Sequence, residues 1–272
     1  MKKATSEKFL IAGIARNCGK TIKDEVLILQ NAMSVFKNKQ WLIIESDSDD
    51  NTVEQLKELE GEVENFRYIS LGNLRNHYPL RTQRIAFCRN KYLEELENNP
   101  SYSDVQYLVV ADLDGVNSYI TGKAIESCWS KPDWTACTAN QWGHYYDVYA
   151  LRHEVWSPND CWDVQRFLGK RGMSEEESIA CAVYSRMISI SETEDWIEVD
   201  SAFGGLAIYK APALKGLRYH GLNQRNEEVS EHVFFHQKIR EGGGKVFINP
   251  QMINGEVNEH TKNFEAYKRS HP

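Results

Sequence analysis

The sequence lacks any long hydrophobic run. Its longest uncharged apolar stretches, residues 9–15 and 202–209, have seven and eight residues, whereas a helix that spans a bilayer needs roughly 20. The N-terminal segment Met-Lys-Lys-Ala-Thr-Ser-Glu is followed by an apolar stretch that is too short for a signal peptide. We therefore expect a cytoplasmic protein without a membrane span, while peripheral association with a membrane stays open.

The sequence also has few cysteines and no excess of positive charge. None of its six cysteines forms a Cys-x-x-Cys pair, so neither a zinc site nor a compact disulfide framework is indicated. The formal net charge of −7 argues against a broad nucleic-acid-binding surface. With 272 residues, 41% of them hydrophobic, the chain can bury a full core, and we expect a single domain over residues 1–272.

Strand and helix patterns alternate along the first half of the chain. Buried strands are predicted at 9–15, 40–44, 66–71 and 107–111, and helices from residue 22, over 52–59 and over 82–97. Because a helix connects each pair of consecutive strands, we expect right-handed crossovers and a mainly parallel sheet. Residues 8–116 are thus predicted to form a Rossmann-like nucleotide-binding half.

The second half, residues 117–272, has a looser pattern. The predicted strands are short and lie near 135–140, 196–199, 202–209 and 245–248, and the predicted helices cover 120–129, 174–190 and 232–241. The segment 141–172 is rich in Trp, Tyr and Asp and shows little periodicity. This half is therefore expected to be a mixed region that completes the same domain.

Two acids stand at the end of the fourth predicted strand. Asp112 and Asp114 are spaced i, i+2, so their side chains point to the same face of an extended chain. Open α/β sheets bind ligands at the carboxyl ends of their strands, where a carboxylate pair can hold a divalent cation against a diphosphate. Such a pair also arises where a strand simply ends in solvent, so the surrounding segments decide between the two interpretations.

Two further polar segments lie at the ends of predicted strands or helices. The acidic turn that contains Glu45 and Asp47 follows the second strand, where it can cap the next helix or supply an acid to a ribose hydroxyl. Arg81, Arg84 and Arg89 lie near the start of the next predicted long helix. Guanidinium groups there can neutralise a diphosphate, or they can form a solvated helix face.

The order of these segments resembles GT-A glycosyltransferases. It consists of Ile-Ala-Arg16-Asn17, then Glu45-Ser-Asp-Ser-Asp-Asp50-Asn-Thr, then Arg84-x-x-x-x-Arg89-Asn90, then Asp112-x-Asp114 and then Tyr145-Tyr-Asp147-Val-Tyr-Ala-Leu-Arg152. The string resembles glycosyltransferase family 2. It is more similar to the fungal capsular α-1,3-mannosyltransferase family and its microbial relatives.

This resemblance implies a GT-A-like α/β fold and a nucleoside diphosphate sugar as the donor. Asp112 and Asp114 would hold Mn²⁺ or Mg²⁺, and one of His232, His236 and His260 would be a third ligand, with His260 as our first choice. The donor contacts would come from Ala15, Arg16, Asn17, Glu45, Asp47, Arg84, Arg89, Asp112 and Leu113.

The resemblance also suggests two residues on the acceptor side. Asp147 would lie near the transferred sugar. In inverting GT-A enzymes an acid at a helix start deprotonates the acceptor hydroxyl, and Glu231 holds such a position, although an acid there can simply complement the helix dipole. Family 2 enzymes invert the anomeric carbon and the capsular family retains it, so both courses stay open. Tryptophans between Trp142 and Trp162 could stack on an acceptor sugar.

The sequence thus predicts a metal-dependent glycosyltransferase that moves a hexosyl unit to a glycan or glycolipid hydroxyl in surface polysaccharide synthesis. Two other interpretations stay open. A nucleotidyltransferase shares the paired acids but usually has a Gly-rich phosphate loop after the first strand, where this chain reads Arg16-Asn-Cys-Gly-Lys20. A non-catalytic module that binds a nucleotide or a sugar would show the same motifs without turnover.

Overall fold

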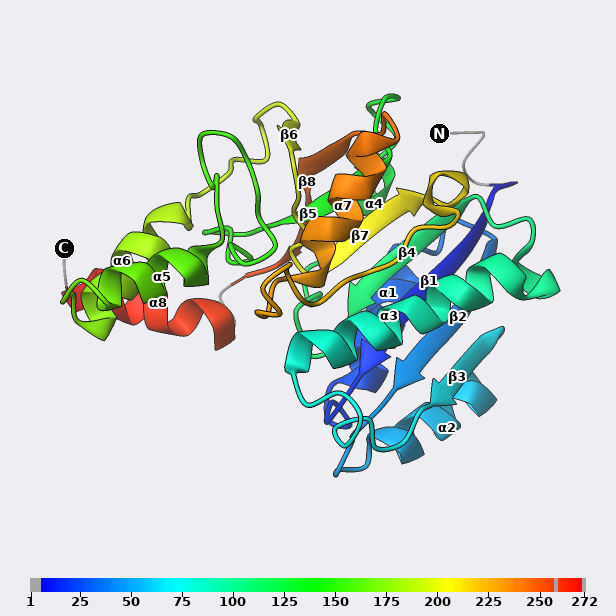
Figure 1. Ribbon diagram of the computed structural model, residues 1–272. Helices are drawn as coiled ribbons and strands as arrows, with labels where there is room; N and C mark the ends of the chain where they lie inside the picture. The colour runs from blue at the N-terminus through cyan, green and yellow to red at the C-terminus, as the bar shows by residue number, and fades with distance from the viewer. Residues whose placement is uncertain (1–5, 257–258, 271–272) are drawn as a thin grey trace.

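The computed structural model describes residues 6–256 and 259–270. A single sheet of eight strands, in the order β3-β2-β1-β4-β7-β5-β8-β6, runs through the molecule with helices on both faces (Figure 1). The strands are β1 (Lys8–Ala15), β2 (Asn38–Glu45), β3 (Phe66–Ser70), β4 (Tyr107–Asp112), β5 (Ala136–Gln141), β6 (Ile197–Val199), β7 (Leu206–Lys210) and β8 (Val246–Gly255).

Most strands of the sheet point in one direction. β1 to β4 pair in parallel with one another, and β5 pairs in parallel with β8. β7 runs antiparallel between β4 and β5, and β6 runs antiparallel beside β8. Because β7 is antiparallel to both of its neighbours, β5 and β8 have the direction of β1 to β4. The carboxyl ends of these strands therefore meet at the same edge of the sheet.

The helices vary in length, and none in the described ranges 6–256 and 259–270 is long and apolar enough to cross a membrane. The α-helices are α1 (Ile22–Ala32), α2 (Thr52–Glu62), α3 (Arg81–Asn98), α4 (Gly122–Ser127), α5 (Cys161–Gly169), α6 (Glu175–Ala182), α7 (Glu231–Glu241) and α8 (Glu259–Ser270). Short 3₁₀ turns cover Pro100–Tyr102, Tyr184–Arg186 and Ala211–Leu214.

Alternation of side chains along the strands divides the core into two layers. In β1, Phe9 and Ile11 pack with apolar residues of α1, α2 and α4. Leu10 and Ala12 point to the other face and pack with apolar residues of α3 and α7. The sheet is thus covered on both faces, as expected for a buried parallel sheet.

A third, smaller core lies in a helical lobe formed by α5, α6 and α8, which projects beyond the sheet (Figure 1). Its buried residues include Val148, Cys161, Ala182, Met187 and Phe264. α5 and α6 come from the middle of the chain and α8 from its C-terminal part. The lobe therefore depends on contacts between segments that lie far apart in the sequence.

The predicted fold class and the four strands of the first half are confirmed. Predictions for the second half were less accurate. The segment 141–172 contains α5, which was not predicted, and α8 was also missed. The helix predicted over 174–190 ends at Ala182. The strand predicted from residue 202 begins at Leu206, because Gly204 and Gly205 adopt positive φ angles of 69° and 83°.

Gly205 is needed for close packing as well as for its backbone angle. A Cβ atom at this position would lie 2.8 Å from Val116 Cγ2 and 2.9 Å from the Tyr146 hydroxyl oxygen. Gly243, which follows α7, has the same φ angle of 83°, but a Cβ atom there would meet nothing within 4 Å. A comparison of substitutions at the two glycines therefore separates the cost of backbone strain from the cost of steric crowding.

We predict that Gly205→Ala destabilises the protein more than Gly243→Ala. The left-handed conformation costs an L-residue about 1–2 kcal/mol at either position. Crowding in a packed interior adds about 1–3 kcal/mol, which only the Gly205 variant should experience. Urea unfolding measures both losses in the free energy of unfolding, and equal losses would contradict the packing described around Gly205.

Candidate functional site

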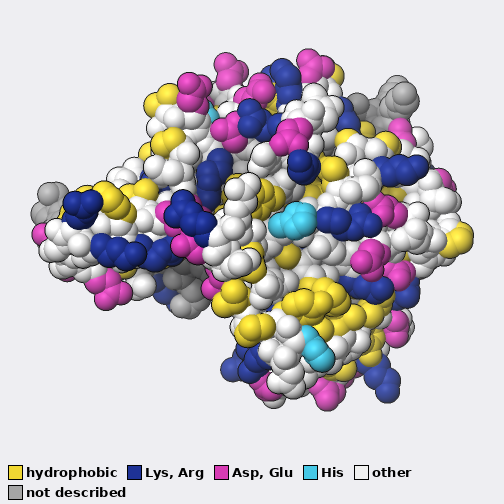
Figure 2. Space-filling view, in the orientation of Figure 1, with side chains coloured by type: hydrophobic (Ala, Val, Ile, Leu, Met, Phe, Trp, Pro, Cys, Tyr) yellow, Lys and Arg dark blue, Asp and Glu magenta, His cyan; other side chains and the backbone are white. Residues whose placement is uncertain are grey.

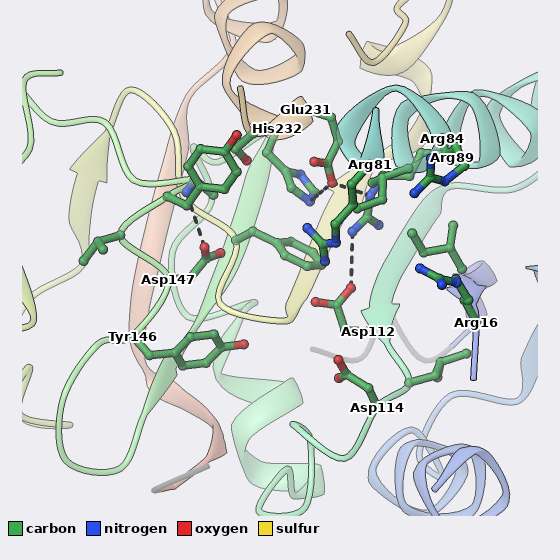
Figure 3. Close-up of a pocket in the computed structure, with 18 of the residues that line it drawn as sticks. Arg16, Arg81, Arg84, Arg89, Asp112, Asp114, Tyr146, Asp147, Glu231 and His232 are labelled. Carbon is green, nitrogen blue, oxygen red and sulfur yellow. Dashed lines mark hydrogen bonds and ion pairs between the residues drawn. The ribbon is translucent and has the colours of Figure 1, made fainter. Parts of the chain in front are cut away.

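A cavity of about 730 Å³ lies at the carboxyl ends of β1 and β4 (Figure 3). The strand order reverses at this point, since β2 lies on one side of β1 and β4 on the other. Ligands of open α/β sheets bind at such switch points. Both halves of the chain contribute to the lining, which includes Ala15, Arg16, Asp47, Arg81, Arg84, Arg89, Asp112, Leu113, Asp114, Tyr146, Asp147, Glu231 and His232.

Two of the predicted site residues, Asn17 and Glu45, lie just behind this lining. Asn17 has a positive φ angle of 51°, and its side-chain oxygen accepts a hydrogen bond from the Asp49 N–H at 2.7 Å. Glu45 is buried, and its carboxylate accepts hydrogen bonds from the Ser48 N–H at 3.1 Å and from a serine hydroxyl of β3. Both residues therefore shape the loop that carries Asp47.

Asp47 presents an unsatisfied carboxylate oxygen at the cavity. Its Oδ1 accepts hydrogen bonds from the N–H groups of Leu74 and Arg75, each at 3.0 Å. Its Oδ2 is buried and accepts no hydrogen bond from the described residues, and Arg84 Nε lies 3.8 Å away. A buried acceptor without a donor is costly, and a ligand N–H or O–H would satisfy it.

The arginines around the cavity differ in how strongly they are held. Arg84 Nη1 donates to two backbone carbonyls just before α3, at 2.7 and 2.8 Å. Arg16 Nε donates to the Asp47 carbonyl at 3.4 Å. Arg81 forms no hydrogen bond or ion pair with any residue that the structure describes, and it projects into the cavity (Figure 3). Arg81 is therefore the cation most available to a ligand.

Arg89 is the centre of a buried cluster of charges. Its Nε donates to Glu231 Oε1 at 2.7 Å and its Nη2 to Asp112 Oδ1 at 3.2 Å (Figure 3). The side chain is 3% exposed, and its guanidinium lies 5.0 Å from the centre of the Phe203 ring. Burial opposes the charge, but the surrounding negative groups hold the pKa of Arg89 well above its ordinary value. Arg89 thus connects the end of β4 with the start of α7.

Asp112 and Asp114 both line the cavity at the end of β4 (Figure 3). Burial raises the pKa of Asp112 to about 7 in spite of the opposing charge of Arg89, and the charge of Asp114 adds to the rise. Asp114 is exposed and forms no hydrogen bond or ion pair with the described residues. Two carboxylates so placed offer the oxygen ligands that Mg²⁺ and Mn²⁺ prefer.

The described residues contain no group of three or more His, Cys, Asp or Glu side chains that could hold a metal ion. His260 belongs to the first turn of α8, and its side chain lies outside the described part of the structure. His236 is buried with both ring nitrogens bonded, Nδ1 to Ser201 Oγ at 3.0 Å and Nε2 to the Tyr209 hydroxyl at 2.9 Å. His236 therefore has no nitrogen left for a metal, and burial lowers its pKa to about 3.

Asp147 lies on the side of the cavity opposite the arginines (Figure 3). Its Oδ2 accepts a hydrogen bond from the Gly204 N–H at 2.9 Å, and its Oδ1 accepts one from the Ala150 N–H at 3.3 Å. The next residue, Gly205, accepts a hydrogen bond from the Asp112 N–H at 2.9 Å. A single short turn before β7 therefore connects Asp147 with the acidic pair.

A buried polar network supports the loop after β4. Asn117 Nδ2 donates to the Asp112 carbonyl at 2.7 Å and to Glu25 Oε2 at 2.9 Å, and Asn117 Oδ1 accepts from Asn254 at 2.9 Å. Burial raises the pKa of Glu25 to about 7. This network was not predicted from the sequence. The available signal was the position of Glu25 on the apolar stripe of α1 with Leu29, where a charged residue is unusual.

Family models and curated proteins yield no match to this chain. Solved structures do match it. The mannosyltransferase PcManGT from Pyrobaculum calidifontis, in complex with GDP-Man and Mn²⁺, has a TM-score of 0.56 and 12% identity over 97% of this chain and 60% of that chain. TarS from S. aureus has a TM-score of 0.51 and 10% identity over 96% of this chain and 64% of that chain. TarS in complex with UDP-GlcNAc matches with a TM-score of 0.51 and 11% identity over 93% of this chain and 59% of that chain.

These similarities show that the chain has the GT-A fold, as predicted from the sequence. This chain spans 60% of the PcManGT chain, 64% of the TarS chain of residues 1–349 and 38% of a longer TarS chain.

We predict that Glu25→Gln stabilises the protein more at pH 8 than at pH 5. The pKa of Glu25 is about 7 in the folded state, against roughly 4.3 in an unfolded chain. The folded state binds the extra proton between these values, so ionisation of Glu25 removes stability as the pH rises through this window. Glutamine stays neutral and keeps an acceptor oxygen for Asn117. Urea unfolding should show the variant gaining about 2–3 kcal/mol between pH 5 and 8 relative to the parent protein. A difference that is independent of pH would contradict the raised pKa.

Proposed function

We propose that this protein is a metal-dependent glycosyltransferase that transfers a hexosyl unit from a nucleoside diphosphate sugar to a hydroxyl of a glycan or glycolipid, in the synthesis of a surface polysaccharide. The observation that carries this proposal is the cavity at the switch point of the sheet, where Asp112 and Asp114 share the lining with Arg81, whose side chain has no hydrogen bond or ion pair with the described residues. Two solved structures that share the fold contain GDP-Man with Mn²⁺ and UDP-GlcNAc, which supports the class of donor.

The nucleoside of the donor is proposed to lie between the ends of β1 and β2. Ala15, Arg16 and Asp47 line the cavity there, and Oδ2 of Asp47 lacks a donor among the described residues. A nucleobase N–H or a ribose hydroxyl would satisfy this oxygen. Asn17 and Glu45 act on the nucleoside through the loop that they hold, since each is bonded to the acidic turn around Asp47.

Asp112 and Asp114 would hold Mn²⁺ or Mg²⁺, and the chemistry of the pair fits such an ion. Burial and neighbouring acids make the charge of Asp112 costly, as its raised pKa indicates, and a cation would relieve that cost. Mg²⁺ sites are often completed by waters and substrate phosphates, so two protein carboxylates are sufficient. The bound ion would offset charge on the leaving diphosphate. Arg81 is placed to bind the phosphate oxygens directly, and Leu113 forms the adjoining wall.

The acceptor hydroxyl is proposed to lie between Asp147 and Glu231, which both line the cavity. Glu231 Oε1 is held by Arg89, whereas Oε2 accepts no hydrogen bond from the described residues. This arrangement holds the carboxylate in place and leaves one oxygen to take the hydroxyl proton as a general base. Asp147, whose carboxylate is held by backbone N–H groups, would orient the sugar.

We predict that binding of a nucleoside diphosphate requires a divalent cation. With Mn²⁺ present, UDP or GDP should raise the melting temperature, because a ligand at 100 times its dissociation constant stabilises a protein by about 2.7 kcal/mol. Excess chelator should abolish the shift, since two carboxylates would then face the phosphates without a cation. Asp114→Asn should lose most of the shift, whereas Asp195→Asn, a change at an exposed acid outside the cavity, should keep it. An undiminished shift in chelator would show that the acidic pair holds no metal.

We further predict that Glu231→Gln lowers turnover by roughly 10²- to 10⁴-fold while donor binding stays unchanged. Glutamine can still accept the hydrogen bond from Arg89 but cannot accept a proton. Glu241→Gln, at the other end of α7, is the control. NMR of the product should show an inverted anomeric carbon. A retained configuration together with near-normal turnover of the Glu231 variant would leave this residue only the role of holding Arg89.

A further inference from the structure

A second, smaller hollow opens beside the main cavity, and the donor contacts described above use only Arg81 among its lining residues. Its volume is about 240 Å³. It shares Arg81, Tyr149 and Trp162 with the main cavity, and its remaining lining residues are Thr82, Arg166 and Glu228. Because the two spaces have walls in common, one extended molecule can occupy both.

Trp162 forms an open apolar wall of this hollow. It lies in the first turn of α5, where the side chain of Asp160 accepts hydrogen bonds from the N–H groups of Trp162 and Asp163. The tryptophan is 38% exposed, and its indole neither stacks on another ring nor donates a hydrogen bond within the described residues. The C–H groups on one face of a sugar ring pack well against the electron-rich face of an indole, and the indole N–H can reach a hydroxyl. The wall is therefore suited to a pyranose.

Two guanidinium groups border the same hollow. Arg166 follows Trp162 by four positions in α5, so the two side chains lie on one face of the helix. Arg166 pairs with Asp163, but the two side chains are 48% and 47% exposed, and such surface pairs contribute little and exchange readily. Arg81, on the opposite wall, has no hydrogen bond or ion pair with the described residues.

One oxygen of the acid in the hollow is bonded. Glu228 Oε1 accepts a hydrogen bond from the Thr82 N–H at 3.0 Å, and the Thr82 hydroxyl lies 3.1 Å from this oxygen and 2.6 Å from the Gly221 carbonyl, its nearer acceptor. Figure 2 shows Lys and Arg side chains gathered over the part of the lobe that carries α5. Two guanidinium groups and one carboxylate line the hollow, and this excess of positive charge favours a negatively charged ligand. Guanidinium groups bind carboxylate and phosphate with paired hydrogen bonds.

We propose that this hollow is an acceptor subsite for an anionic sugar, in which Trp162 stacks on the ring while Arg166 binds its carboxylate or phosphate. The proposal rests on the glycosyltransferase function proposed above and adds the class of acceptor. The acceptor is a charged glycan of at least two sugar units. One unit lies at Glu231 and receives the hexosyl group, and its neighbour occupies the hollow.

The test measures binding of trigalacturonic acid and of its uncharged methyl ester by calorimetry, with mannose 6-phosphate and mannose as a second pair that replaces the carboxylate by a phosphate. At least one charged probe should bind about tenfold or more tightly than its neutral partner, since hydrogen bonds to charged groups are the stronger ones. The pair that shows this difference identifies the anion. Trp162→Ala and Arg166→Gln should each weaken the charged probe about fivefold or more, while Trp162→Phe, which keeps a ring, should lose less.

Matched controls come from the same helix and the turn after it. Phe167 is 56% exposed and Arg171 lies over its ring at 5.1 Å, and neither lines the hollow, so Phe167→Ala and Arg171→Gln should leave binding unchanged. UDP and GDP binding with Mn²⁺ is measured on every variant. If nucleotide binding persists while charged and neutral probes bind alike, fail to bind, or bind equally well to Trp162→Ala, the subsite is refuted and the proposed function stands. If the parent protein binds neither nucleotide, the function on which the subsite rests is refuted as well.

Discussion

One buried cation, Arg89, fixes the two sides of the cavity relative to each other. It bonds to Asp112 at the end of β4 and to Glu231 at the start of α7, and aromatic rings enclose it. In such a poorly hydrated place two carboxylates without a cation would repel each other, and loss of one partner of a buried pair typically costs about 3–5 kcal/mol. The charge of Asp112 and the position of Glu231 across the cavity therefore both depend on Arg89.

The first half of the fold could be predicted because its signals are local. Each strand is a continuous apolar run and each helix repeats its apolar residues at the helical period, so neighbours in sequence already define the layers. The lobe has no such signal. α5 and α8 each bury only a narrow face, and Cys161 and Phe264 meet in one small core although they are distant in the chain. A short amphipathic helix completed by a remote partner looks irregular when it is read alone.

The candidate site likewise contains residues whose positions could be predicted from the sequence and residues whose roles could not. The positions of Asp112 and Asp114 could be predicted because the local sequence shows where the strand ends and which side chains share a face. The roles of the arginines were not, since Arg81, Arg84 and Arg89 lie on one helix within nine residues and look equivalent in sequence. Their difference comes from distant partners: Arg89 meets Glu231 across 142 positions of chain. Glu25 was missed for a related reason, because its partner Asn117 lies 92 positions away.

The antiparallel strand β7 has a consequence for how this fold can diversify. By reversing direction between β4 and β5, it brings the ends of β5 and β8 to the edge that already carries the ends of β1 and β4. The chain that leaves β5 and the chain that leaves β8 build the lobe from this edge, without interrupting the sheet. Insertions, deletions or exchanges in the lobe can therefore change one side of the cavity while the strands that carry Asp112 and Asp114 stay intact. Recombination between related chains would have natural junctions at Gln141 and Gly255.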